Sequence, residues 1–203
     1  VSTINSEYVA VEGRVDATPT GDANITVQDI NGQISNRGIN GDAALWIRAN
    51  TVSRRVSSVG VNKLYVECQK IFGDVYTNSD AGLVYIRTDK ITDFTGNGCL
   101  NIGGGEVWVD VSHLDPGVNT GAIIVSGGEL KLRGADFTAT ATAVGVSVSG
   151  GTLRISDCNI NTAANSSTSP ITKSGGTLIV KDCTLVAEST ATSISAPTAQ
   201  TVI

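Results

Sequence analysis

The sequence predicts an all-β protein in which short parallel strands stack as a solenoid, and three observations support this fold class. One stretch, residues 150–160, recurs along the chain at intervals of 19 to 25 residues. Apolar and polar residues alternate inside each copy, as in strands with one buried face. The composition, with 23 glycines and 40% apolar residues, favours strands and turns, and no window shows a helical period.

The repeats keep three apolar positions in every copy: a leading residue, a second one two positions later and a third one seven positions later. A unit this small cannot bury its own apolar face, so neighbouring units must stack. The leading residues are Leu45, Leu64, Val84, Val107, Leu130, Leu153 and Leu178; the second are Ile47, Val66, Ile86, Val109, Leu132, Ile155 and Val180; the third are Val52, Ile71, Ile91, Leu114, Phe137, Ile160 and Leu185.

The first residues follow this repeat least well. Residues 8–11 alternate like a strand, and residues 16–22 contain the proline, glycine and aspartates of a loop. Residues 25–27 begin 20 residues before Leu45 and are predicted as the first full strand. We therefore expect an irregular strand and loop segment at residues 1–24, followed by a solenoid domain of about eight coils at residues 25–203.

Each later coil contains two further strands and a glycine corner. A short strand precedes the leading residue, at residues 100–102, 123–125, 146–148 and 171–173. Between the two strands lie Gly103–Gly105, Ser126–Gly128, Ser149–Gly151 and Ser174–Gly176, and glycines at one register mark a corner that a side chain would obstruct. The residues around Phe137, Ile160 and Leu185 supply a third strand. Three strands per coil of 19 to 25 residues describe a parallel β-helix.

This pattern resembles the right-handed single-chain parallel β-helices of the pectate-lyase type, which include bacteriophage tailspikes and tail fibres. The resemblance covers residues 25–203 and concerns architecture, because no motif ties the chain to one family within the group. It implies a location on a virion or outside the cell, and assembly into homo-oligomers, with trimers favoured. The calcium-binding GGxGxD repeat is not matched, since Gly104-Gly105-Glu106-Val107 lacks its aspartate.

Outward positions of the stacked strands form rows along the solenoid, because equivalent residues of neighbouring coils lie about 4.8 Å apart. One position after the leading residue come Trp46, Tyr65, Tyr85 and Trp108, here called the aromatic row, followed by Lys131, Arg154 and Ile179. Such a row is a platform for sugar rings, a surface buried against another subunit, or a set of strand-favouring residues without a partner.

Three positions after the leading residue come Arg48, Glu67, Arg87, Asp110 and Arg133, here called the charge row. Their signs alternate from coil to coil, which fixes strand register and keeps the face soluble. Glu67 and Asp110 could instead be an inverting glycosidase pair, since two coils separate them by about 10 Å. Arg87 lies between them, however, and would keep both carboxylates ionised, whereas a general acid needs a raised pKa.

No other group of residues indicates catalysis or a cofactor. His113 is the only histidine and is expected on the surface. The cysteines Cys68, Cys99, Cys158 and Cys183 contain no CxxC pair, so no metal site is predicted, and Cys158 and Cys183 should be adjacent, reduced core residues. The net charge of −5 argues against nucleic acid, and no apolar run reaches the length of a membrane span.

The sequence contains no methionine, which suggests a processed product or part of a longer protein. Ile194 follows Ile171 by 23 residues, so a further turn should begin there, covered by downstream sequence or by other subunits. We predict a structural, oligomeric, non-catalytic component of a bacteriophage appendage that contacts other virion proteins or cell-surface polysaccharide. The alternatives are an extracellular polysaccharide-degrading lyase or hydrolase of the same fold, and a bacterial surface adhesin.

Overall fold

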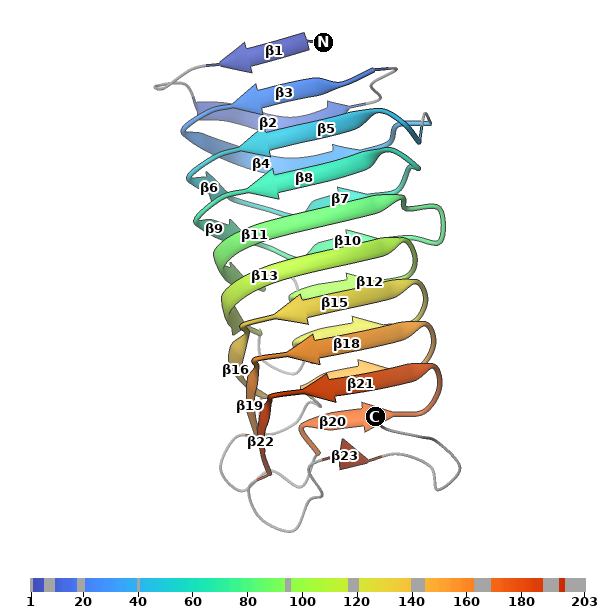
Figure 1. The fold of residues 1–203 in the computed structure, drawn as a ribbon. Helices are drawn as coiled ribbons and strands as arrows, with labels where there is room; N and C mark the ends of the chain where they lie inside the picture. The colour runs from blue at the N-terminus through green and yellow to red at the C-terminus, as the bar shows by residue number, and fades with distance from the viewer. Residues whose placement is uncertain are drawn as a thin grey trace.

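The computed structural model describes residues 2–5, 10–17, 21–39, 41–93, 96–116, 121–139, 145–162, 169–187 and 194–195. Every regular element within these residues is a β-strand, and every strand pairing is parallel (Figure 1). The chain runs leftward across the front, rightward across the back and downward from its N-terminus, which is a right-handed coil (Figure 1). The predicted right-handed parallel β-helix is therefore confirmed.

The strands form three faces. The front face contains β1 (Ser2–Asn5), β3 (Ala23–Thr26), β5 (Ala44–Arg48), β8 (Lys63–Glu67), the first parts of β11 (Leu83–Thr92) and β13 (Glu106–Asp115), β15 (Glu129–Arg133), β18 (Thr152–Ser156) and β21 (Thr177–Lys181). The side face contains the first parts of β2 (Ala10–Ala17) and β4 (Asp29–Asn36), then β6 (Thr51–Val52), β9 (Lys70–Phe72), the ends of β11 and β13, β16 (Asp136–Ala139), β19 (Asn159–Thr162) and β22 (Thr184–Val186).

The back face starts with the ends of β2 and β4 and continues with single short strands. These are β7 (Val56–Ser58), β10 (Val75–Thr77), β12 (Leu100–Ile102), β14 (Ile123–Val125), β17 (Val146–Val148), β20 (Ile171–Lys173) and β23 (Ile194–Ser195). The pairing of Ile194 with Ile171 confirms the further turn expected there. The number of strands stacked on each face is close to the predicted eight coils.

The register predicted from the leading residues is confirmed at single-residue precision. Leu45 pairs with Leu64, which pairs with Val84, and the ladder continues through Val107, Leu130, Leu153 and Leu178. The register predicted for the first strand is wrong by two residues: Ala23 lies opposite Leu45, and Ile25 lies opposite Ile47. Alanine gives a weaker apolar signal than isoleucine, so the sequence pattern favours Ile25 at the leading position that Ala23 occupies.

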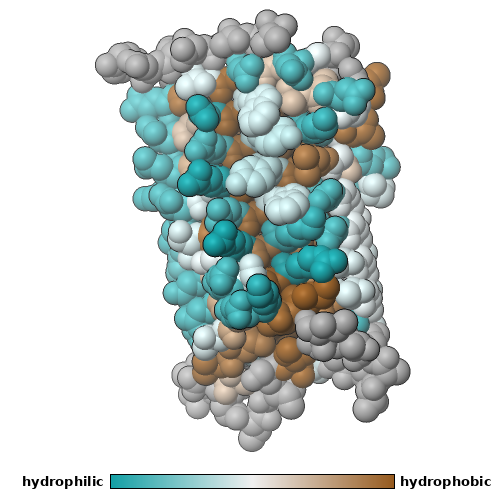
Figure 2. Space-filling view, viewed as in Figure 1, coloured by the Kyte–Doolittle hydropathy of each residue, from teal (hydrophilic) through white to brown (hydrophobic). Residues whose placement is uncertain are grey.

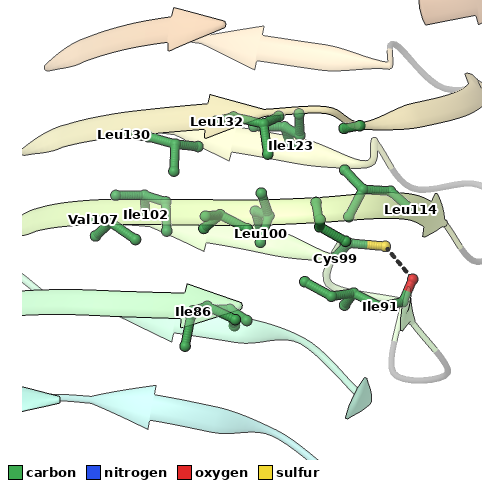
Figure 3. Close-up of a cluster of buried hydrophobic side chains, with 14 of the residues drawn as sticks. Ile86, Ile91, Cys99, Leu100, Ile102, Val107, Leu114, Ile123, Leu130 and Leu132 are labelled. Carbon is green, nitrogen blue, oxygen red and sulfur yellow. Dashed lines mark hydrogen bonds between the residues drawn. The ribbon is translucent and has the colours of Figure 1, made fainter. Parts of the chain in front are cut away.

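The interior is a continuous aliphatic core. Inward residues of all three faces are buried in the middle coils, among them Leu132, Ile155 and Phe137, and those near the two ends, such as Ile25 and Val180, are partly buried. Figure 3 shows side chains from neighbouring coils meeting between the sheets, with the thiol of Cys99 donating to the carbonyl of Ile91 at 3.6 Å. Each added coil extends this core along the axis and makes contact with the coils on either side of it.

Tight corners join the back strands to the front strands. Gly151 and Gly176 have φ values of +62° and +64°, a region that favours glycine. A Cβ atom on Gly151 would lie 2.4 Å from the carbonyl oxygen of Gly128, and one on Gly176 would lie 2.5 Å from that of Gly151. The glycines therefore allow backbones of successive coils to stack in contact, as the sequence predicted.

Candidate functional site: a groove along the front sheet

The front sheet displays two outward rows along its whole length, because alternate residues of each strand point away from the core. The aromatic row is confirmed as a set of direct neighbours: Trp46 pairs with Tyr65, Tyr65 with Tyr85, and Tyr85 with Trp108. The row continues with Lys131, Arg154 and Ile179, as the alignment predicted. Figure 2 shows the sheet from outside, with a pale column along it and a hydrophilic column to its left.

The aromatic side chains interact with one another rather than standing apart. The rings of Trp46 and Tyr65 are stacked, with centroids 3.8 Å apart and planes 5° apart. The rings of Tyr65 and Tyr85 are 6.4 Å apart and tilted by 41°. Because Trp46 and Tyr65 cover each other's faces, their edges remain available to a ligand. An aromatic edge carries partial positive charge and favours oxygen atoms.

A polar cluster continues the row beyond Trp108. The ammonium group of Lys131 lies 4.0 Å from the centre of the Trp108 ring, and both side chains donate to Glu106, Lys131 at 2.6 Å and Trp108 at 2.9 Å. These two hydrogen bonds lower the pKa of Glu106. Arg154 donates to Glu129 at 2.6 Å. The second half of the row is therefore held in place by charge pairs.

The charge row lies beside the aromatic row in the predicted register. Glu67 lies between Arg48 and Arg87, Arg87 pairs with Asp110, and Asp110 pairs with Arg133. The two carboxylate oxygens of Glu67 are 2.9 Å from Arg48 and 3.8 Å from Arg87. The row continues with Ser156 and Lys181 on β18 and β21.

A groove runs between the two rows. Its first part, about 500 Å³, is lined by both rows from β3 to β11, and its second part, also about 500 Å³, is lined by both rows from β11 to β21. Tyr85 lines both parts, so we treat them as one front groove with the backbone of the sheet as its floor. A third hollow, about 760 Å³, lies on the other side of the charge row. A groove parallel to the solenoid axis suits an extended, linear ligand.

A cation separates the two carboxylates that the sequence analysis weighed as a glycosidase pair. Arg87 occupies the position between Glu67 and Asp110. His113 is exposed on the side face, between Lys90 and Asp136. Among the described residues, no group of three His, Cys, Asp or Glu side chains could hold a metal ion. Within the same residues, no helix is long and apolar enough to cross a membrane.

The cysteines lie in or against the core. Cys158 and Cys183 occupy neighbouring coils, as predicted, and the backbone N–H of Cys158 donates to the Cys183 sulfur at 3.4 Å. All four thiols are free. Burial raises the pKa of Cys68 to about 11 and the pKa values of Cys99 and Cys158 to about 12. These thiols are therefore neutral at physiological pH and poor nucleophiles.

The repeat alignment predicted which residues share a row, but not the groove between the rows. Glu106 and Glu129 lie one position before the leading residue, outside both predicted rows. They orient Lys131 and Arg154 along the wall of the groove. The signal was present in the sequence, because Glu106 and Glu129 fall at the same register in successive repeats.

No protein-family model, curated protein or solved structure matches this chain.

Proposed function

We propose that this chain is a structural, non-catalytic segment of a bacteriophage tail fibre, tailspike or similar extracellular appendage, and that its front groove binds glycan chains on a host surface. The observation that supports glycan binding is the groove itself. It runs along the solenoid axis between the aromatic row and the charge row, and its floor is a hydrogen-bonded sheet. The appendage assignment is supported by the architectural resemblance to phage β-helices.

The residues of the groove suit recognition of sugars without their cleavage. Arginine and carboxylate side chains, spaced by the strands, can hydrogen-bond successive sugar hydroxyls, and the exposed edges of the aromatic rings favour sugar oxygen atoms. Both oxygens of Glu67 already face guanidinium groups. A carboxylate held in this way is suited to accepting hydrogen bonds from sugar hydroxyls.

A second proposal for the same face is contact between subunits, with a homotrimer as the expected assembly. Trp46 and Trp108 are 46% and 41% exposed, a large apolar area for an isolated surface. A groove that binds glycan must stay open to solvent in the assembly, whereas a subunit contact would close it. The two proposals therefore predict different accessibility of the same tryptophans.

The test combines three measurements on the intact chain. Purified bacterial surface polysaccharides are assayed for binding by biolayer interferometry, and the mixtures are assayed for new reducing ends. Sedimentation equilibrium gives the oligomeric state of the wild type and of the Trp46→Ser/Trp108→Ser double variant. We expect glycan binding that the double variant loses, unchanged assembly and no new reducing ends.

Each other result points to one competing proposal. New reducing ends would show a polysaccharide-degrading enzyme. Loss of assembly in the double variant would show a subunit contact, and a monomeric wild type would refute the proposed oligomer. Binding to no polysaccharide would refute the glycan-binding function.

A further inference from the structure

The front groove is lined by cations along its length. Its described lining includes six cations, Arg48, Arg87, Lys131, Arg133, Arg154 and Lys181, and two carboxylates, Glu67 and Asp110. Four further carboxylates, Glu106, Glu129, Asp157 and Asp182, lie within 4 Å of Lys131, Arg154, Arg133 and Lys181, so the six cations are balanced by six carboxylates. The position of each cation along the groove, rather than a net positive charge, can therefore select an anionic ligand.

The cations of one wall are regularly spaced. From β5 to β21 the row reads Arg48, Glu67, Arg87, Asp110, Arg133, Ser156, Lys181, one residue per strand. A cation therefore stands on every second strand, and the strands between carry a carboxylate or a hydroxyl. With about 4.8 Å between stacked strands, the cations repeat every 9.6 Å or so.

These cations remain available to a ligand. The side chains of Arg48, Arg87, Arg133 and Lys181 are 73%, 65%, 71% and 76% exposed, although each has a carboxylate within 4 Å. Exposed ion pairs of this kind are worth at most about 1 kcal/mol, because water screens them. A ligand carboxylate can therefore compete for these cations or share them.

We propose that the groove binds a linear polysaccharide in which acidic and neutral sugars alternate. In an extended chain of pyranose rings, each sugar advances by nearly one strand spacing, so an acid on every second sugar meets a cation on every second strand. The neutral sugars then face Glu67, Asp110 and Ser156, which accept hydrogen bonds from hydroxyl groups. A polymer with an acid on every sugar would instead place carboxylates against Glu67 and Asp110. This inference rests on the proposed glycan-binding function of the groove.

The test compares three immobilised polymers by biolayer interferometry with the intact chain. Hyaluronan alternates acidic and neutral sugars, polygalacturonate has an acid on every sugar, and hydroxyethylcellulose is neutral. We expect the Kd for hyaluronan to be at least about tenfold lower than for hydroxyethylcellulose, severalfold lower than for polygalacturonate, and to rise with salt because exposed charges are screened. Equal or tighter binding to either of the other polymers would overturn the alternating pattern.

Substitutions distinguish recognition of alternating charges from a general electrostatic attraction between the protein and an acidic polymer. Arg87→Gln and Arg133→Gln should each weaken hyaluronan binding by about fivefold, the equivalent of 1 kcal/mol, whereas Lys70→Gln, on the exposed side face, should leave it unchanged. Glu67→Gln/Asp110→Asn should selectively improve polygalacturonate binding. Equal loss in all three single variants, or no gain in the double variant, contradicts the inference.

The two proposals fail in distinguishable ways. If the chain binds bacterial surface polysaccharides but prefers hydroxyethylcellulose, or binds none of the three polymers, the alternating pattern is wrong and glycan binding stands. If it binds neither the surface polysaccharides nor the three polymers, both proposals are lost.

Discussion

Arg55 binds both carboxylate oxygens of Asp74 in the neighbouring coil. Its Nε donates to Oδ1 at 2.8 Å, and its Nη2 lies 2.8 Å from Oδ2. The Asp74 side chain is fully buried, whereas Arg55 is 35% exposed and its guanidinium carbon lies 5.2 Å from the centre of the Tyr76 ring. The hydrogen bond that Arg55 donates to Asp74 raises the pKa of Arg55, so the guanidinium stays charged. The buried Asp74 carboxylate would be energetically costly without this arginine, which neutralises its charge.

Replacing Arg55 should therefore destabilise the solenoid more than its partial exposure suggests. We expect Arg55→Leu to lower the free energy of unfolding by about 3 kcal/mol, because it leaves the Asp74 charge buried and unpaired. Arg54→Leu, at an exposed neighbouring position, should change it by less than about 0.5 kcal/mol. Urea unfolding followed by circular dichroism measures both. An Arg55→Leu protein as stable as Arg54→Leu would show that the pair contributes nothing.

A charge in the centre of the aliphatic ladder should prevent folding. Leu132 is 2% exposed and lies between Val109 and Ile155 of the adjacent coils. Leu132→Asp buries a carboxylate without a partner, at a cost of more than about 4 kcal/mol. Arg133→Asp, one position later and 71% exposed, is the control and should fold. A soluble Leu132→Asp protein that melts cooperatively would contradict the core assignment.

The glycine corners should not tolerate side chains. Gly151→Val and Gly176→Val each combine a left-handed backbone with a Cβ placed within 2.5 Å of a carbonyl oxygen. We expect each to cost more than about 2 kcal/mol. Gly21→Val is the control, because a Cβ there meets nothing within 4 Å. The melting temperature of the control should be far above those of both corner variants. Equal melting temperatures for all three would refute the placement of Gly151 and Gly176 at tight corners.

The buried thiols should resist alkylation in the folded protein. Burial raises the pKa of Cys99 and of Cys158 to about 12, so the reactive thiolate is scarce at pH 8. Iodoacetamide at pH 8 should leave both unlabelled in the native state and label all four cysteines in urea. Peptide mass spectrometry identifies the modified residues. Rapid native labelling of Cys99 would show that its coil opens readily.

The sequence predicted the stacking because in-register coils convert an alignment directly into contacts. The pairing of Leu153 with Leu130 and Leu178, and of Trp46 with Tyr65, could be derived before any coordinates. The domain boundary at residue 24 stays a prediction, although β1 and β2, within residues 1–24, pair with β3 and β4.

Features outside the repeat could not be predicted in this way. The Arg55–Asp74 pair joins only two neighbouring coils and is not repeated along the chain, so the repeat pattern does not indicate it. Asp157 and Asp182 adopt φ values of +55° and +52°, at the register where the preceding coil has Gly134 at +78°. The periodicity of apolar residues does not indicate whether φ is positive or negative. The face-to-face contact of Trp46 with Tyr65, unlike the tilt of Tyr65 against Tyr85, depends on rotamers that a register does not determine.

The two-strand period of the charge row constrains how this chain can change length during evolution. Tandem duplication or unequal recombination adds or removes one coil at a time, and the core and glycine corners would accept this because each coil meets only its neighbours. Loss of the coil that carries Asp110 would bring Arg87 next to Arg133, and like charges on adjacent strands are destabilising. In this part of the molecule, the gain or loss of two coils at once is therefore less disruptive than the gain or loss of one.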